Sequence, residues 1–191
     1  HWSHLELQRY FGYTGILNSE TAEEAWNLCN AKLQEDSMSV RNLIKQSGVT
    51  LICTTDDPAD DLSWHKVIAA DDTFDVKVLP AWRPDKAMNL EKPDYADYLA
   101  KLGEAAQMEI KTFADLKEAL KKRVAESMGC CASDHALEYV MYVPASDEEL
   151  EAIFAKRVNG EAITREEELK FKTAFMLFVG REYARMGWAM Q

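Results

Sequence analysis

The sequence has 191 residues, of which 47% are hydrophobic and 29% are charged, as is typical of a folded domain with a sizeable core. This composition argues against disorder, and a net charge of −11 without a basic patch argues against a nucleic-acid or anionic-membrane partner. An anionic substrate remains compatible with this charge, because binding depends on the local potential around one or two arginines.

The cysteines indicate the cellular compartment of the protein, and the chain ends indicate whether the chain is a fragment. No CxxC pair and no spacing used for zinc occurs among the four cysteines, so we expect free thiols in a cytoplasmic protein. They are Cys29, Cys53, Cys130 and Cys131. No apolar run approaches the roughly 18 residues of a membrane span, and no charged-then-apolar leader opens the chain. Because the chain begins with His1 and stops at Gln191 where an apolar segment begins, we expect both ends to be cuts.

The first part of the chain combines helices with two short strands. Thr21 and Glu24 form a capping box, which predicts a helix start. A strand is predicted over residues 49–53. Asp57-Pro58 suits the first turn of a helix, because proline at the first helical position gives up a hydrogen bond that would be unmade anyway. A second strand is predicted over residues 75–79.

The second part is mostly helical around one more strand. Apolar side chains fall on one face of residues 113–124 and of residues 150–158, which predicts two packed helices. A third strand is predicted over residues 130–132. Two further helix starts are predicted by the capping boxes Ser146/Glu149 and Thr164/Glu167. Residues 169–186 are apolar nearly all round, so we expect a helix that is covered on most sides.

Strands separated by helices predict β-α-β units and a parallel sheet, whose ligand sites lie at the carboxyl ends of the strands. We therefore divide the chain into a helical segment over 1–48, a β/α segment with a helical insertion over 49–145, and a helical segment over 146–191. Each predicted strand is followed by a cluster of polar residues, and we expect the functional residues to lie in these clusters.

The stretch Trp82-Arg83-Pro84-Asp85-Lys86 is a candidate anion-binding loop after the second strand. An arginine there can bind a carboxylate through two parallel hydrogen bonds, a geometry that lysine cannot match. The alternative is that Arg83 pairs only with Asp85 or with another neighbour.

The stretch Ser133-Asp134-His135 follows the third strand. Adjacent side chains of an extended chain point to opposite faces, so Asp134 and His135 cannot both face one substrate unless the strand has already ended. We expect one of them to be structural. Desolvation in mostly apolar surroundings would raise the pKa of a carboxylate, which suits a general base. The alternative is a hydrogen-bonded structural pair.

The stretch from Thr54 to Pro58 contains two acids, Asp56 and Asp57, that could bind hydroxyl groups or a metal. One aspartate is expected to cap the helix that begins at Pro58, which leaves the other for function.

The histidines are weaker candidates. His1 and His4 lie one helical turn apart, but a zinc-protease helix needs glutamate directly after the first histidine, where Trp2 stands. We therefore expect no metal ligands there, and we expect His65 to be a partly exposed helix residue.

Six motifs in this order resemble those of the uronate (glucuronate) isomerase family, a branch of the amidohydrolase superfamily built on a (β/α)8 barrel. They are HWSHLEL at 1–7, TAEEAWN at 21–27, TTDDP at 54–58, WRPDKA at 82–87, SDHAL at 133–137 and REYARMGW at 181–188. The resemblance covers essentially the whole chain.

The resemblance implies an α/β fold, a partial (β/α)8 TIM-type barrel with about three parallel strands, the second to the fourth, and large helical insertions. Residues 1–48 would then precede the second barrel strand, and Gln191 would stop just short of the fifth. A complete barrel takes about 250 residues, so we expect an internal fragment that is inactive alone. Some of the core surface of the strands would then be exposed or covered by a second copy of the chain, which would make a homo-oligomer.

The resemblance also implies a reaction and site residues. The reaction is the reversible conversion of D-glucuronate to D-fructuronate, and of D-galacturonate to D-tagaturonate, by hydrogen transfer between C2 and C1. Arg83 would bind the substrate carboxylate, Asp134 would be the catalytic acid or base, and Asp56 is a weaker substrate-binding candidate. Such barrels hold a divalent, zinc-like metal through residues of the first, fifth and eighth strands that are absent here, so no cofactor is expected within this chain.

Two other functions stay open at this point. One is hydrolysis of a sugar lactone or ester by an enzyme of the same superfamily. The other is a non-catalytic helical interaction module that uses residues 169–186 as its partner surface.

Overall fold

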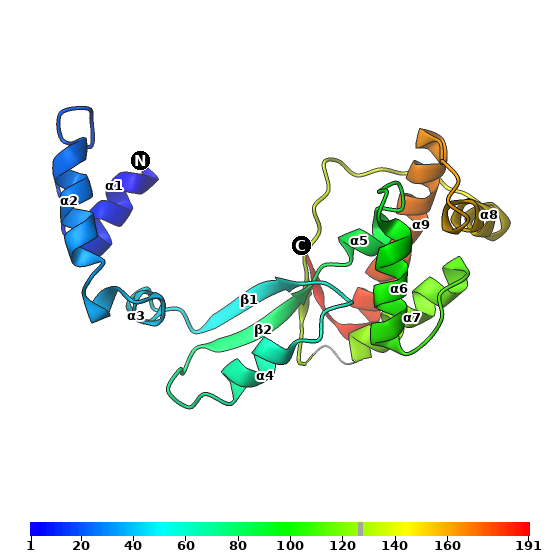
Figure 1. Ribbon diagram of the computed structural model, residues 1–191, viewed down its shortest axis with the longest axis horizontal. Coiled ribbons are helices and arrows are strands. Elements are labelled where there is room, and N and C mark those ends of the chain that lie inside the picture. The colour runs from blue at the N-terminus through cyan, green and yellow to red at the C-terminus, as the bar shows by residue number, and fades with distance from the viewer. Residues whose placement is uncertain (126–127) are drawn as a thin grey trace. The chain divides into compact units, whose positions relative to one another are not determined.

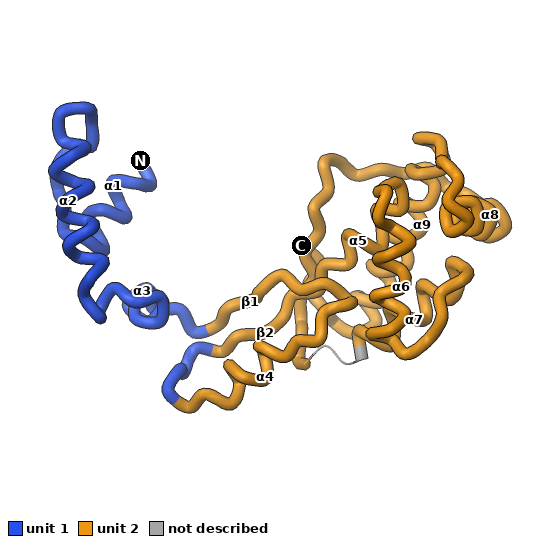
Figure 2. The backbone as a smooth tube through the Cα atoms, viewed as in Figure 1, with its two compact units in different colours: residues 1–50, 73–76 blue, residues 51–72, 77–191 orange. Residues whose placement is uncertain are grey.

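The computed structural model describes residues 1–125 and 128–191, which form two compact units (Figure 2). Unit 1 comprises His1–Thr50 and Thr73–Val76, and unit 2 comprises Leu51–Asp72 and Lys77–Gln191. None of the helices in the described ranges has the length and apolar character needed to cross a membrane.

Unit 1 is built from short helices. They are α1 (Trp2–Glu6), the π-helical turn η1 (Leu7–Phe11), α2 (Ala22–Lys32), the 3-10 turn η2 (Asp36–Met38) and α3 (Val40–Gln46). The predicted helix start at Thr21 is confirmed, but the capping box is wrong. The Thr21 hydroxyl instead accepts a hydrogen bond from the Asn18 amide at 3.0 Å and donates to the Ile16 carbonyl at 2.6 Å, so the preceding turn occupies it.

Unit 2 contains a four-stranded sheet in which, among the described residues, all strand pairs are parallel and the order is β1-β2-β3-β4. The strands are β1 (Leu51–Asp56), β2 (Lys77–Trp82), β3 (Ala132–Ser133) and β4 (Ala189–Met190). The α/β class and the parallel sheet are as predicted.

The strand boundaries differ from the prediction in one consistent way. Each of the first three strands starts two residues later than expected, at 51, 77 and 132 rather than 49, 75 and 130. The backbone ladder therefore extends into polar residues, and Asp56 pairs with Trp82 inside it. The chain also does not stop short of a further strand, because Ala189 and Met190 pair with β3. Backbone pairing, rather than apolar side chains, decides where these strands end.

The helices of unit 2 are α4 (Ser63–Ala69), α5 (Asp85–Met88), α6 (Tyr95–Ala106), α7 (Phe113–Ala125), α8 (Asp147–Val158) and α9 (Arg165–Met186). In Figure 1, α4 runs alongside β1 and β2, whereas α6 to α9 gather beyond the ends to which these arrows point. The capping boxes of Ser146 and Thr164 are both confirmed. The helix expected at Pro58 is wrong: residues 58–59 form a turn, and α4 begins at Ser63.

The core of unit 2 is aromatic where the long helices meet. Phe171 of α9 packs against Phe113 of α7, with ring centroids 4.9 Å apart, and against Phe154 of α8 at 6.1 Å. All three side chains are buried, as the apolar faces predicted. The expectation that α9 is covered on most sides is confirmed over residues 171–179, where Ala174, Met176 and Phe178 also pack against the core and only Leu177 is exposed, at 44%. A narrow stripe that includes Leu177 is the part of α9 left in contact with solvent.

The end of α9 positions the last strand. Gly187 terminates the helix with φ of 71°, a left-handed conformation that glycine adopts without the steric cost of a Cβ atom. The next residue, Trp188, stacks on Tyr183 with ring centroids 5.8 Å apart and contacts the edge of Trp82 at 6.4 Å. This packing of Trp188 places the following residues, Ala189 and Met190, beside β3 as strand β4.

Phe171→Ala should lower the free energy of unfolding by about 3–5 kcal/mol, because truncating a fully buried phenylalanine leaves a cavity. Urea unfolding of the 191-residue chain measures this loss. The matched control is Leu177→Ala on the exposed face of the same helix, for which a change within about 1 kcal/mol is expected. Equal losses in both variants would contradict the placement of Phe171 in the core and of Leu177 on the exposed stripe.

Candidate functional site

The candidate site lies at the carboxyl ends of β1, β2 and β3, where the backbone ladder continues one residue past β2 and β3. The Arg83 amide donates to the Asp56 carbonyl at 2.9 Å, and the Asp134 amide donates to the Trp82 carbonyl at 3.0 Å. Carboxyl ends of parallel strands meet at one edge of a sheet. Side chains from residues 51 positions apart are thereby held next to each other.

Arg83 and Asp134 form an ion pair at this edge. The Arg83 Nη2 group donates to Asp134 Oδ2, and the Thr55 hydroxyl lies 3.5 Å from the same oxygen. The side chain of Arg83 is 37% exposed and that of Asp134 is 27% exposed. Because both partners are in contact with solvent, the pair is worth little, and either group can exchange its partner for a ligand.

Asp85 lies behind this pair and contacts three groups. Its Oδ2 atom accepts a hydrogen bond from the Ala136 amide at 2.9 Å and lies 3.8 Å from Arg83 Nε, and its Oδ1 atom lies 3.4 Å from His135 Nδ1. Burial alone would raise the pKa of Asp85, but the contacts with His135, the Ala136 amide and Arg83 outweigh it and hold the pKa below its ordinary value of 3.8. Asp85 is therefore a charged, largely buried anchor.

His135 is buried although its neighbour Asp134 is partly exposed, and both follow the end of β3 at Ser133. Its side chain is 2% exposed, and its ring packs against Tyr183 with centroids 5.7 Å apart. Of the two adjacent residues, Asp134 faces the open edge and His135 is structural.

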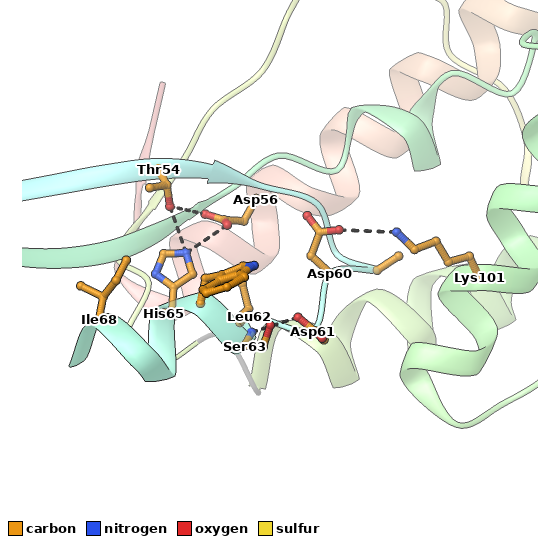
Figure 3. Close-up of a pocket in the computed structure, with 11 residues that line it drawn as sticks. Thr54, Asp56, Asp60, Asp61, Leu62, Ser63, His65, Ile68 and Lys101 are labelled. Atoms are coloured by element: carbon orange, nitrogen blue, oxygen red, sulfur yellow. Dashed lines mark hydrogen bonds and ion pairs between the residues drawn. The ribbon is translucent and has the colours of Figure 1, made fainter. Parts of the chain in front are cut away.

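Asp56 lies apart from Arg83 and Asp134. Its carboxylate accepts a hydrogen bond from the Thr54 hydroxyl at 2.5 Å and contacts His65 Nε2 at 3.0 Å (Figure 3). Side chains alternate along a strand, so Thr54 and Asp56 share one face of β1 while Thr55 shares the other face with Asp134. The assignment of Asp56 to substrate binding remains a prediction, and its contacts point to the face opposite the Arg83–Asp134 pair.

A pocket of about 530 Å³ opens on that opposite face. Thr54, Asp56 and His65 line one side of it, and the turn after β1 and Lys101 of α6 line the other (Figure 3). The expectation for His65 is wrong, because its side chain is buried at 7% exposure. Its ring faces the polar side of β1, which the helical pattern of residues 63–69 does not reveal.

Asp57 forms a turn instead of capping a helix. Its Oδ1 atom accepts hydrogen bonds from the Ala59 amide at 2.9 Å and from the Tyr98 hydroxyl at 3.0 Å. Burial raises the pKa of the Asp57 carboxyl above its ordinary value of 3.8, although these hydrogen bonds oppose the rise.

A metal centre is not formed by the described residues. Within 1–125 and 128–191, no group of three or more His, Cys, Asp or Glu side chains is placed to hold a metal ion. The polar groups that lie together at the edge are one arginine, two carboxylates and a hydroxyl.

The model of the glucuronate isomerase family matches residues 1–191, which is the whole chain. The chain belongs to the glucuronate isomerase family. This confirms the resemblance carried by the six sequence motifs.

Relatives in this family cover the whole chain at high identity. The chain is 69% identical to the uronate isomerase of Lachnospira eligens and 67% identical to that of Lachnoclostridium phytofermentans. It spans 41% of the length of each of these relatives.

Solved structures of glucuronate isomerases share the fold. The uronate isomerase of Thermotoga maritima superposes with a TM-score of 0.86 at 34% identity, over the whole of this chain and 42% of that one. The glucuronate isomerase of Caulobacter crescentus superposes with a TM-score of 0.87 over 40% of its chain, and at 23% identity this likeness shows the fold alone. A parallel four-stranded sheet in a chain of this coverage fits the predicted partial barrel.

Two contributors to the candidate site do not stand out in the sequence. Thr55 was grouped with Asp56, although the period-two alternation of a strand separates their side chains. Asp85 was considered only as a partner of Arg83, whereas it also holds the turn after β3 through Ala136. The alternation of β1 was a usable signal for Thr55; nothing local indicated the contact between Asp85 and a residue 51 positions away.

Asp85 and Asp57 should respond to pH in opposite ways. The folded-state pKa of Asp85 is lowered, so its contribution to stability is present above pH 3.8 and is lost as the pH falls through the folded pKa. The folded-state pKa of Asp57 is raised, so its contribution is present below pH 3.8 and is lost as the pH rises through the folded pKa.

Urea unfolding of wild type, Asp85→Asn and Asp57→Asn across the acidic range measures this contrast. The stability advantage of wild type over Asp85→Asn should shrink as the pH falls, and its advantage over Asp57→Asn should shrink as the pH rises. Acid effects elsewhere cancel in these differences. Parallel pH profiles for the two variants would contradict the assignment.

Proposed function

We propose that this chain supplies the carboxylate-binding edge of an aldose-ketose isomerase acting on hexuronates, converting D-glucuronate to D-fructuronate and D-galacturonate to D-tagaturonate. The observation that carries the proposal is the solvent-accessible Arg83–Asp134 pair at the carboxyl edge of a parallel sheet. Membership of the glucuronate isomerase family supports it.

Arg83 would bind the uronate carboxylate. Its planar guanidinium can form two parallel hydrogen bonds with a carboxylate, and these charge-assisted bonds are stronger than neutral ones. Asp134 would then remove the proton from C2 of the aldose as a general base. The electron pair of the C2–H bond forms the C1–C2 double bond, the C1 oxygen is protonated, and return of a proton to C1 with loss of the C2 hydroxyl proton yields the ketose.

The direct contact between Arg83 and Asp134 constrains these roles. Carbon–carbon bonds of about 1.5 Å put C2 and the carboxylate carbon about 5 Å apart in an extended sugar chain. The two side chains would then serve different parts of the substrate, and Asp134 occupies Nη2, one of the groups that a carboxylate needs for two parallel hydrogen bonds. We infer that the pair is a resting arrangement, and that the substrate carboxylate takes the place of Asp134 on Arg83.

This exchange is energetically modest. An exposed ion pair contributes about 0–1 kcal/mol, and the substrate carboxylate offers Arg83 the same charge with better geometry. The displaced Asp134 keeps the Thr55 hydroxyl within 3.5 Å as an alternative partner. Binding of the substrate carboxylate to Arg83 would thereby release Asp134 to act as the general base.

A divalent metal would polarise the C1 carbonyl when bound. The roles proposed for the residues of this chain are to bind the carboxylate and to move a proton. We propose that any such ligands belong to other parts of a longer enzyme.

In a full-length enzyme that carries this segment, Arg83→Lys should raise KM by about tenfold or more with little change in kcat, because a bidentate charge-assisted contact is lost. Asp134→Asn should lower kcat by about a hundredfold or more without raising KM, because a general base is lost while its competition for Arg83 is removed. Steady-state kinetics with D-glucuronate measures both variants.

Asp97→Asn, an exposed change on α6, is the control and should behave as wild type. If Asp134→Asn raised KM and left kcat unchanged, Asp134 would act by holding Arg83 and not as a base. If the full-length wild type cleaved sugar lactones or esters but left D-glucuronate unchanged, the hydrolase alternative would replace the isomerase.

We further propose that the protein acts in the cytoplasm and that the chain associates with a second copy. Four free cysteines, two of them exposed, suit a reducing compartment. Trp2 and Trp26 of unit 1 are 77% and 70% exposed, which is unusual for large apolar side chains.

Sedimentation velocity tests this association. The sedimentation coefficient of the chain should rise with concentration, and the double variant Trp2→Ser/Trp26→Ser should abolish the rise because it removes both apolar contacts. A wild-type chain that stays monomeric at high concentration would overturn the proposal.

A further inference from the structure

Asp85 is the residue on which the two loops of the candidate site converge. It opens α5 directly after the Arg83-Pro84 turn, so it belongs to the loop that follows β2. Its Oδ2 atom nevertheless accepts a hydrogen bond from the Ala136 amide in the segment that follows β3. One carboxylate thus ties together the two segments that carry Arg83 and Asp134.

The guanidinium of Arg83 is held between two acids. Its outer Nη2 group pairs with Asp134, while its Nε group is buried and lies 3.8 Å from Asp85 Oδ2. The outer contact can exchange with solvent or ligand, since Asp134 is 27% exposed. The inner contact cannot, because the side chain of Asp85 is only 13% exposed.

The other oxygen of Asp85 faces His135. The His135 Nδ1 atom lies 3.4 Å from Asp85 Oδ1, and the ring is wedged against Tyr183 in the core. Tyr183 in turn stacks on Trp188. Asp85 is therefore held in position by the packed ring of His135. Its negative charge stays in place when the outer partner of Arg83 changes.

We propose that Asp85 is a positioning residue that orients Arg83 for the substrate carboxylate and fixes the turn carrying Asp134. The inference rests on the proposed function. Asp85 does not touch substrate in this scheme; it acts through Arg83. A fixed guanidinium loses less conformational freedom on binding, so its bidentate contact contributes more fully to affinity for an anion.

The test compares two substrates in a full-length enzyme that carries this segment. D-Glucuronate has the carboxylate, and D-glucuronamide replaces it with a neutral amide of nearly the same size. Asp85→Asn keeps an oxygen that can accept from the Ala136 amide but removes the negative charge facing Arg83. The ratio of kcat/KM for the two substrates is independent of the fraction of enzyme that is folded, so a general loss of structure does not change it.

Wild type should prefer D-glucuronate, and Asp85→Asn should reduce this preference by about tenfold, as expected for one weakened charge-assisted contact. Most of the change should appear in KM for D-glucuronate, with D-glucuronamide little affected. The exposed Asp97→Asn variant on α6 should keep the wild-type ratio. In an Arg83→Lys background, Asp85→Asn should have no further effect on the ratio, because the two residues act in series.

The outcomes separate the two proposals. If wild type prefers D-glucuronate and Asp85→Asn keeps that preference, the positioning role is wrong while the proposed function stands. If wild type does not distinguish the substrates, the proposed contact between Arg83 and the carboxylate is wrong. Should Asp85→Asn fail to fold, His135→Asn replaces it, and it should lower the same ratio by a smaller factor; an unchanged ratio there would overturn the proposal.

Discussion

The backbone hydrogen bonds that close the parallel ladder are the constraint on which the candidate site depends. The Arg83 amide binds the Asp56 carbonyl, and the Asp134 amide binds the Trp82 carbonyl. These bonds extend the sheet one residue beyond β2 and β3, where the side chains become polar. Backbone pairing therefore brings together a guanidinium and a carboxylate that are far apart in sequence. No contact between the two loops is required for this. The loops then add Asp85, which joins them from behind.

The proposed anionic substrate would have to bind to an acidic chain through the charges around Arg83. The net charge of −11 is repulsive at long range, but salt screens charges beyond about 8 Å at physiological ionic strength. At the edge itself, one inner acid holds Arg83 and one outer acid occupies its binding face. The buried acid sets the position of the guanidinium, and the exposed acid can give way. Asp85 and Asp134 are chemically identical, and their different burial gives them different roles.

The two faces of β1 divide a single polar motif. Thr54 and Asp56 turn toward His65 and a pocket, whereas Thr55 turns toward Asp134. The first group makes its hydrogen bonds internally, which favours a role in joining β1 to α4. The second group stands at the edge that carries the proposed chemistry. The division follows from the period of two in any strand.

The sequence by itself determined the features that rest on local chemistry. The capping boxes of Ser146 and Thr164 form between residues three apart, and the family motifs lie within short runs. The parallel α/β class also followed from strands separated by helices. The sequence also predicted that one of Asp134 and His135 is structural, and the burial of His135 decided which.

Only the tertiary structure decided which faces are covered and which loops touch. The ladder runs into Asp56 because neighbouring backbone groups pair there, whatever the side-chain pattern. His65 is buried because α4 presents it to β1, and Leu177 is exposed although its neighbours Met176 and Phe178 pack against the core. The link from Asp85 to Ala136 depends on the separation of β2 and β3 in space, a distance that no local pattern of residues encodes.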